Sequence, residues 1–340
     1  MKLYVSFKVN FFNKVNMEKA IIIREYGNSK VLKLEDINVV RPNQDEIFIK
    51  HSAIGVHFHD CYVRSGLYKT LNLPGIPGLE AVGVIEEVGK GVTNFKPGDR
   101  IGYINSGYGA YSSHRVLDKK LAFKIPEFIS DELIATNFSR SITVQMLIEE
   151  ATQLNPSDTI LVTAATGGVG RLLCQWANAL GACVIGTSSN EEKALIAKSY
   201  GCKYSLTYDQ KDFNAQIRDI TNGKGVDKVY DSVGLQTFQS SLESLAYCGH
   251  LINFGQSSGA VDPILMSTLS HKSLTISRPI IFHYIANEEL YKKMTKAVFN
   301  AFKNKNINIP KAEGYSLKDA SIAHDILESR RGGGSLFLKP

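Results

Sequence analysis

The stretch Thr-Ala-Ala-Thr-Gly-Gly-Val-Gly (TAATGGVG, residues 163–170) decides the fold, because it joins two different sequence patterns. The residues before it, 159–162, form a short apolar run that predicts a buried strand. The residues after it, from 169 to 180, follow a helical pattern. A glycine-rich bend between a strand and a helix is a place where an anion can bind, because the helix begins with free N–H groups and a positive dipole.

The register of small residues in this bend is a variant of G-x-G-x-x-G with alanine in the first position. Small residues permit the tight turn, Gly167 lets backbone N–H groups approach a pyrophosphate, and Gly170 lets the helix pack closely on the strand. A turn that only packs, and a protein that senses nucleotides without catalysis, remain alternatives. The bend therefore predicts a dinucleotide contact at Ala165, Gly167, Gly168, Val169 and Gly170.

The end of the second strand indicates which dinucleotide is expected. NAD-binding folds place an acidic residue there, whereas here the strand 183–187 continues into Ser188, Ser189 and Asn190. A 2′-phosphate carries nearly two negative charges, which Ser188 can hydrogen-bond and Lys193 can neutralise. Two such contacts are worth about 3 kcal/mol, so we expect NADPH rather than NADH. The alternative for Lys193 is a solvated position on a helix.

The length of 340 residues favours two domains over one. The composition, 44% hydrophobic and 21% charged, is typical of a soluble globular protein, and no run approaches the roughly 20 apolar residues of a membrane span. The formal net charge is +6, but three lysines and no acids lie in residues 1–16, which leaves +3 (6 − 3) for the rest. This modest charge gives little support to nucleic-acid binding.

Residues 1–16 (MKLYVSFKVNFFNKVN) are expected to be an N-terminal extension outside the core fold, with Met17 as the cleaner start. They lack the apolar centre and cleavage site of a signal peptide, and a membrane-surface helix is the alternative. The cysteines are scattered, without a C-x-x-C pair, which favours reduced thiols in a cytoplasmic protein over a disulfide framework or zinc knuckle. They are Cys61, Cys174, Cys183, Cys202 and Cys248.

The rhythm of the chain changes near residue 140. Residues 17–140 contain short β-like runs separated by turns rich in Pro, Gly and Asp, which predicts a mostly antiparallel β domain. Residues 141–280 alternate between strand and helix patterns, which predicts an α/β fold with a doubly wound parallel sheet. Residues 281–340 contain two helical patterns and a final apolar run, and we expect them to return to the first domain.

From residue 17 to the end, the chain resembles the NADPH quinone oxidoreductase (zeta-crystallin-like) branch of the zinc-free medium-chain dehydrogenases/reductases. The resemblance is close to the bacterial quinone oxidoreductases, and it implies a GroES-like domain followed by a Rossmann domain. It is carried by nine blocks in order: AIGVHFHDCYVRSGLY (53–68), GLEAVGVIEEVG (78–89), KPGDRIGY (96–103), GAYSSHRV (109–116), AATGGVG (164–170), CQWANALGA (174–182), VYDSVG (229–234), FGQSSGAV (254–261) and SRP (277–279).

The resemblance implies roles for individual residues. Lys193, Tyr208 and Arg330 would contact the cofactor phosphate, although Arg330 can also be read as a surface arginine. Tyr62 and Tyr68 would flank a quinone pocket, and either could equally be a packing tyrosine. The nicotinamide and ribose contacts would fall on Tyr62, Thr143, Asp231, Gly234, Phe254 and Gly255.

The zinc-using relatives place metal ligands at positions that correspond here to His57, Leu79 and Ser139. Leucine cannot ligate a metal and serine is a poor ligand, whereas a catalytic zinc needs about three protein ligands. We therefore expect no metal. Quinone reductases of this branch commonly carry asparagine where His57 stands, so His57 could donate a hydrogen bond, supply a proton or be a polar neighbour of the cofactor. Arg140 similarly replaces a common lysine.

The implied activity is NADPH-dependent reduction of a quinone in a cleft between the domains, with His57, Tyr62, Tyr68 and Thr143 as candidate catalytic residues. The residues do not distinguish transfer of one electron from transfer of two. A reductase of α,β-unsaturated aldehydes or ketones is the enzymatic alternative, and a crystallin-like NADPH-binding or nucleic-acid-binding protein is the non-enzymatic one. Homodimers joined through the run 274–279 (LTISRP) are expected by analogy.

Overall fold

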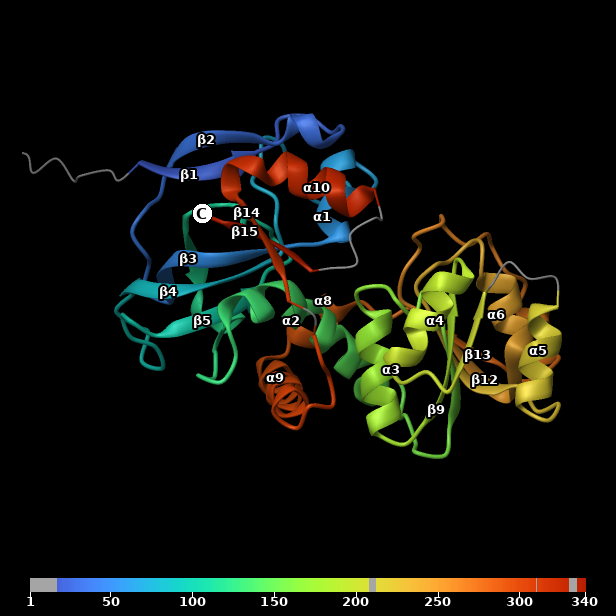
Figure 1. Ribbon diagram of the computed structural model, residues 1–340. Coiled ribbons are helices and arrows are strands. Elements are labelled where there is room, and N and C mark those ends of the chain that lie inside the picture. The colour runs from blue at the N-terminus through green and yellow to red at the C-terminus, as the bar shows by residue number, and fades with distance from the viewer. Residues whose placement is uncertain (1–16, 208–211, 310, 330–334) are drawn as a thin grey trace, which may run out of the picture. The chain divides into compact units, whose positions relative to one another are not determined.

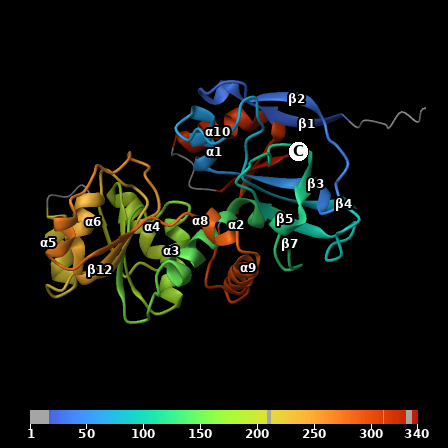
Figure 2. The same ribbon diagram turned by 180° about the vertical axis from the view of Figure 1, so that it is seen from behind.

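The computed structural model describes residues 17–207, 212–309, 311–329 and 335–340 (Figures 1 and 2). Contacts divide this chain into two units, one reaching Lys124 and including Gly314–Pro340, the other spanning Ile125–Glu313. These boundaries differ from those expected near residues 140 and 281, at both ends of the second unit.

The first unit is built around β3 (Glu46–Val56), which pairs antiparallel with strands on both sides. Its alternate residues Ile47 and Ile49 are fully buried, as the alternating pattern of a half-covered strand requires. A separate antiparallel pair joins β1 (Met17–Ile22) and β2 (Lys33–Asn38). The other strands of the β3 sheet are β4 (Glu80–Val88), β5 (Arg100–Ile104), β6 (His114–Asp118), β7 (Ala122–Lys124), β14 (Glu313–Ser316) and β15 (Leu336–Lys339).

Two helices of the first unit, α1 (Phe58–Ser65) and α10 (Ala320–Glu328), lie side by side in both views (Figures 1 and 2). Helix α1 follows β3 directly and ends at Gly66, whose φ of 83° is the left-handed conformation that favours glycine. One-turn 3₁₀ helices occur at Ser29–Val31, Lys119–Leu121 and Leu317–Asp319. The C-terminal segment therefore supplies both a helix and the strand β15 to a unit that the N-terminal residues begin.

The second unit contains a parallel sheet, whose described strands follow the order β10-β9-β8-β11-β12-β13. Residues Ile160, Leu161 and Val162 are fully buried, as expected for a strand covered on both faces. The strands are β8 (Thr159–Val162), β9 (Cys183–Ser188), β10 (Tyr204–Thr207), β11 (Val226–Asp231), β12 (Leu245–Asn253) and β13 (Thr275–Ser277).

Helices connect consecutive strands of this sheet, and Figure 1 shows α3 and α4 against one face and α5 and α6 against the other. Right-handed crossovers in both directions from β8 produce this doubly wound arrangement. The helices are α3 (Gly170–Ala179), α4 (Glu191–Ser199), α5 (Phe213–Ile220), α6 (Phe238–Ser244) and α7 (Met266–Ser270). The predicted fold class, a doubly wound parallel sheet with a mostly antiparallel β domain, is confirmed.

Helix α2 (Asp131–Gln145) begins the second unit and continues into a π-helical turn, Met146–Glu150. It packs against α9 (Glu288–Lys303), which in turn contacts α8 (Ile281–Ile285). These contacts explain why residues 281–313, which were expected to return to the first domain, group with the second unit. The return itself begins at Gly314.

Candidate cofactor and substrate site

The glycine bend has the geometry that its sequence predicts. Ala164 adopts a left-handed φ of 49°, and Gly167 donates its N–H to the Ala164 carbonyl over 2.8 Å. A methyl group at Gly170 would lie 2.2 Å from the Ala164 carbonyl oxygen, so only glycine allows α3 to start this close to the strand. The bend is therefore a cradle closed by backbone atoms, which suits an approaching phosphate.

The bend lies where several parallel strands end. Ala165 donates its N–H to the Thr187 carbonyl over 2.8 Å, which ties the bend to the end of β9. Thr163 donates its hydroxyl to Asp231 at the end of β11 over 2.9 Å. The strand order reverses between β8 and β11, so these residues lie at the switch point where open α/β sheets bind ligands.

Two of the four residues predicted to bind the 2′-phosphate, Ser188 and Lys193, lie in the described part of the chain. Ser188 is the last residue of β9, and its buried hydroxyl has no hydrogen-bond partner among the described residues. Lys193 is half-buried in the first turn of α4. Asn190 caps this helix, because its side-chain oxygen accepts the main-chain N–H of Lys193 over 2.9 Å. A buried hydroxyl without a protein partner fits a ligand oxygen. Tyr208 and Arg330 lie outside the described residues.

Asp231 is fully buried and accepts hydrogen bonds from five protein donors. Two of these donors are the main-chain N–H groups of Val233 and Gly234, over 2.9 and 3.3 Å. The other three donors are the side chains of Thr163, Thr237 and Asn253. The Asp231 carboxylate thus shapes the loop after β11, and a direct contact with the cofactor remains a prediction.

The loops after β11 and β12 bring three further predicted residues together. Phe254 donates its N–H to the Asp231 carbonyl over 2.8 Å. A methyl group at Gly255 would lie 2.5 Å from the Ser232 carbonyl oxygen, and one at Gly234 would lie 2.7 Å from that of Gly259. Gly234 also has a left-handed φ of 86°. Both glycines permit backbones to approach closely at the strand ends.

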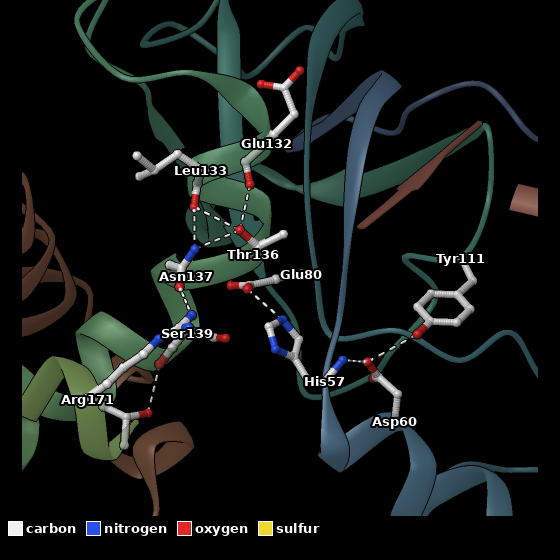
Figure 3. A network of polar contacts seen from close by, with 11 residues as sticks. His57, Asp60, Glu80, Tyr111, Glu132, Leu133, Thr136, Asn137, Ser139 and Arg171 are labelled. Atoms are coloured by element: carbon white, nitrogen blue, oxygen red, sulfur yellow. Dashed lines mark hydrogen bonds and ion pairs between the residues drawn. The ribbon is translucent and has the colours of Figure 1, made fainter. Parts of the chain in front are cut away.

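Helix α2 brings two residues toward the same region of the second unit. A methyl group at Gly168 would lie 3.0 Å from Nε of Arg140, so the guanidinium rests on the glycine bend. Thr143 is half-buried, and its hydroxyl donates to the Ser139 carbonyl over 2.8 Å. Arg140, noted in the sequence only as the replacement of a common lysine, thus places a positive charge beside the bend. Figure 3 also shows the buried Arg171 donating to Asn137 on α2, over 3.3 Å.

In the first unit, His57 caps the N-terminus of α1 and is buried. Its ring Nε2 lies 2.6 Å from Oε1 of Glu80, and its main-chain N–H donates to the Asp60 carboxylate over 2.8 Å (Figure 3). Burial raises the pKa of Asp60 to about 6, against the opposing effects of His57 and the Tyr111 hydroxyl.

A buried chain of polar groups runs from Asp60 to α10. Tyr111 donates its hydroxyl to Asp60 over 3.3 Å and lies 2.9 Å from Nε2 of His324. Nδ1 of His324 lies 3.3 Å from Arg64, which also contacts Glu328. Burial lowers the pKa of His324 to about 3, so its imidazole is neutral at ordinary pH.

The predicted substrate tyrosines lie in an aromatic group at the C-terminal half of α1. The rings of Tyr62 and Tyr68 meet edge to face, with centroids 5.3 Å apart, and both are half-buried. His59 packs against Tyr68 and contacts the Tyr108 hydroxyl over 3.1 Å. His59 is half-buried, and burial lowers its pKa to about 4.

The three positions that correspond to metal ligands in zinc-using relatives are divided between the two units. His57 and Leu79 belong to the first unit, and Ser139 belongs to the second. Across the described residues, no group of three or more His, Cys, Asp or Glu side chains is placed to hold a metal ion. No helix within the described ranges combines the length and apolar character that a membrane crossing requires.

Two known protein families match this chain. Residues 43–127 match the alcohol dehydrogenase GroES-like domain, and residues 168–300 match the family described as zinc-binding dehydrogenase. The first match lies in the unit built around β3 except for its last three residues, 125–127, and the second begins in the glycine bend.

Individual relatives match almost the whole chain. Quinone oxidoreductase 1 of Escherichia coli is 39% identical over 95% of this chain and 100% of its own length, and a 2-haloacrylate reductase from a Burkholderia species is 36% identical over 95% and 99%. The crystal structure of the Escherichia coli quinone oxidoreductase complexed with NADPH matches with a TM-score of 0.90, 39% identity and coverage of 95% and 100%. This chain therefore belongs to the quinone oxidoreductase family of the medium-chain dehydrogenases/reductases.

Proposed function

We propose that this protein is an NADPH-dependent oxidoreductase that reduces quinones by hydride or electron transfer without zinc. The observation that carries the proposal is the glycine cradle at the switch point, together with the Ser188 hydroxyl at the end of β9, which has no hydrogen-bond partner among the described residues. Quinone oxidoreductases are among the relatives that cover 95% of this chain, and the one from Escherichia coli has been crystallised with NADPH.

The residues of the second unit fit a phosphorylated dinucleotide. The backbone of the bend, from Ala165 to Gly170, would hold the pyrophosphate at the start of α3. Ser188 and Lys193 would hold the 2′-phosphate, together with Tyr208 and Arg330 from outside the described residues. Thr143 and the loops that carry Gly234 and Phe254 would contact the nicotinamide end.

When bound, NADPH supplies the reducing equivalents, so the protein has to position the acceptor and stabilise the charge that develops on it. Tyr62 and Tyr68 offer ring faces and hydroxyl groups to a planar acceptor. His57 can hydrogen-bond the oxygen on which negative charge develops, which is the usual electrostatic contribution to such a reaction. A reduced quinone oxygen is a stabilised phenolate, so a strong acid is not required.

A second candidate is the reduction of α,β-unsaturated carbonyl compounds, because a 2-haloacrylate reductase is 36% identical over 95% of this chain. The experiment that tests both functions is a measurement of steady-state NADPH oxidation with 9,10-phenanthrenequinone and with 2-alkenals, with and without a chelator. Quinone turnover that survives the chelator is expected. Turnover of alkenals alone would select the second candidate, and no turnover with either would leave a non-enzymatic, crystallin-like role.

We also propose a cytoplasmic homodimer. In the described part of the chain, β13 pairs with β12 on one side only, so its other edge offers free backbone groups to a second copy. Proline in place of Ile276 would disturb this edge strand, because proline has no backbone N–H. Light scattering of the purified protein is expected to give the mass of a dimer, and that of a smaller species for Ile276→Pro.

A further inference from the structure

A positively charged side chain of α2 lies directly against the glycine bend. A methyl group added to Gly168 would lie 3.0 Å from Nε of Arg140 and 3.2 Å from both Cδ and Cζ. Because three bonded atoms of Arg140 are almost equally distant, the guanidinium lies alongside Gly168. Both residues belong to the second unit, and both are half-buried, so a ligand can still reach them.

The bend itself presents unused backbone donors. The N–H groups of Gly167 and Arg171 are bonded within the bend. In the described part of the chain, the N–H groups of Gly168, Val169 and Gly170 donate to no protein acceptor. These donors stand at the positive end of the α3 dipole. The bend and Arg140 therefore combine partial and full positive charge at one place, which suits an anion.

A buried hydrogen bond fixes α2 beside this bend. Asn137, one helical turn before Arg140, accepts from Nη2 of Arg171 in the first turn of α3 over 3.3 Å (Figure 3). Asn137 and Arg171 are both buried, and Asn137 also donates to the Leu133 carbonyl over 3.3 Å. Positions three apart share one face of a helix. The face of α2 that carries Arg140 is thus held against the start of α3.

We infer that Arg140 is a cofactor-binding residue whose guanidinium pairs with the pyrophosphate of NADPH. The inference rests on the proposed function, because it requires a dinucleotide in the glycine bend. No binding role follows for Arg140 from the sequence, in which the phosphate contacts fall on Lys193, Tyr208 and Arg330. The structure adds a cation at the other phosphate group of the same cofactor.

The chemistry of the pyrophosphate explains why a cation is useful there. Each of its phosphate groups carries a negative charge, whereas a helix N-terminus supplies only about half of one positive charge. A guanidinium supplies a full charge and a planar pair of donors that matches two phosphate oxygens. NADPH and NADH contain the same pyrophosphate. Arg140 therefore increases the affinity for both dinucleotides, whereas Lys193 is expected to distinguish them.

Two other roles for Arg140 make different predictions. A side chain that only packs on the bend would contribute to stability and not to the affinity for phosphate. A side chain that contacts the 2′-phosphate would increase affinity for NADP⁺ but not for NAD⁺. Ligands that contain only one of the two phosphate groups separate these roles, because 2′-AMP carries the 2′-phosphate without a pyrophosphate and NAD⁺ carries the pyrophosphate without a 2′-phosphate.

The test is calorimetric and uses the full-length protein with NADP⁺, NAD⁺ and 2′-AMP. Arg140→Met is expected to weaken Kd for both dinucleotides about tenfold, as for the loss of one charge-assisted contact, and to change Kd for 2′-AMP less than about twofold. Lys193→Ala should show the complementary pattern, with losses for NADP⁺ and 2′-AMP only. Arg218→Met, at an exposed arginine on α5, is the matched control and should change none of the three values.

Unchanged Kd values for both dinucleotides in Arg140→Met would overturn the inference, and so would losses confined to NADP⁺ and 2′-AMP. Arg140→Lys keeps the charge and should recover most of the lost affinity, so a lysine variant as weak as the methionine variant also contradicts the pairing. Urea unfolding checks that the variants fold, and Arg140→Gln replaces Arg140→Met if the latter does not. Failure of the wild type to bind either dinucleotide overturns the proposed function instead.

Discussion

Arg64 on α1 and Glu328 on α10 are joined by two hydrogen bonds, from Nη1 to Oε2 over 3.1 Å and from Nη2 to Oε1 over 2.7 Å. Arg64 is a donor at every nitrogen, so the nearby Nδ1 of His324 has to accept and the proton of that ring resides on Nε2. Nε2 then donates to Tyr111, and Tyr111 donates to Asp60. Hydrogen bonds that all donate in the same direction, from His324 through Tyr111 to Asp60, therefore link α10 to the start of α1.

The Arg64–Glu328 contact predicts an asymmetric loss of stability. Arg64 is 3% exposed and Glu328 39% exposed, so Arg64→Met removes a buried donor and should cost about 3 kcal/mol. Glu328→Gln should cost about 1 kcal/mol or less, because solvent screens the exposed carboxylate. Urea unfolding measures both. Arg24→Met, which breaks the exposed pair with Glu35, is the control and should change stability by less than about 1 kcal/mol; equal losses in all three variants would contradict the assignment.

His324 predicts sensitivity to acid. Its folded pKa of about 3 lies below the ordinary 6.5, so the unfolded chain takes up a proton before the folded one does. The stability contributed by the neutral ring is complete above pH 6.5 and is lost as the pH falls toward 3, by about 2 kcal/mol at pH 5. His324→Gln can still donate and accept but cannot titrate. Its unfolding free energy should therefore fall less steeply between pH 7 and 5, and a slope equal to that of the wild type would refute the prediction.

Asp60 predicts the opposite pH dependence. Its folded pKa of about 6 lies above the ordinary 3.8, so its contribution to stability is complete below pH 3.8 and is lost as the pH rises through 6. The loss amounts to about 3 kcal/mol at most. Asp60→Asn removes this titration, so the wild type should lose stability relative to the variant as the pH rises from 4 to 6. Chemical unfolding across this range decides the matter, and parallel curves would count against the buried, raised carboxyl.

Variants of the residues predicted to bind the 2′-phosphate should show a kinetic defect with NADPH only. Lys193→Ala and Arg330→Ala should each raise KM for NADPH about tenfold, which corresponds to loss of one charge-assisted contact. KM for NADH should remain nearly unchanged, because NADH has no 2′-phosphate. Lys198→Ala, an exposed lysine on the same helix as Lys193, is the matched control and should leave both values unchanged. Equal losses with the two cofactors would mean that these residues do not recognise the phosphate.

The glycine bend predicts a structural cost that also affects binding. Gly170→Ala forces a methyl group against the Ala164 carbonyl oxygen, so we expect a loss of about 2–4 kcal/mol in stability and a weaker Kd for NADPH by calorimetry. Gly107→Ala is the control, because Gly107 is exposed and its added methyl meets only the flexible Asn105 side chain. A Gly170→Ala protein as stable as the Gly107→Ala protein would show that the bend can open at little cost.

Local patterns in the sequence predicted the elements that local chemistry dictates. The strand before the bend, the helix after it and the alternation of strands and helices are all present, because covered strands and amphipathic helices leave a period in the sequence. The first residues of β12 lack such a period: the strand begins at Leu245, and within it Cys248 adopts a left-handed φ of 61°. An irregular strand of this kind has no periodic pattern to reveal it.

Long-range contacts could not be predicted in the same way. Glu80 meets His57 only because β4 runs back along β3 and α1 begins where β3 ends. The sequence pattern of α9 is that of any surface helix, so the sequence does not show that α9 packs against α2. Asp231 was predicted as a cofactor contact from its position, but its five hydrogen bonds depend on loops that the sequence does not place.

The pairing of β15 with β3 has a consequence for how the protein is made. Leu336 to Leu338 bond to Ile54–Val56, so part of the β3 edge lacks its neighbour until residues 336–338 have been synthesised. On the ribosome, the second unit can complete its parallel sheet from contiguous sequence. In the first unit, the apolar edge of β3 stays unpaired during this time. Such an edge can recruit other chains, so prematurely terminated products should be the ones that aggregate and require chaperones during expression.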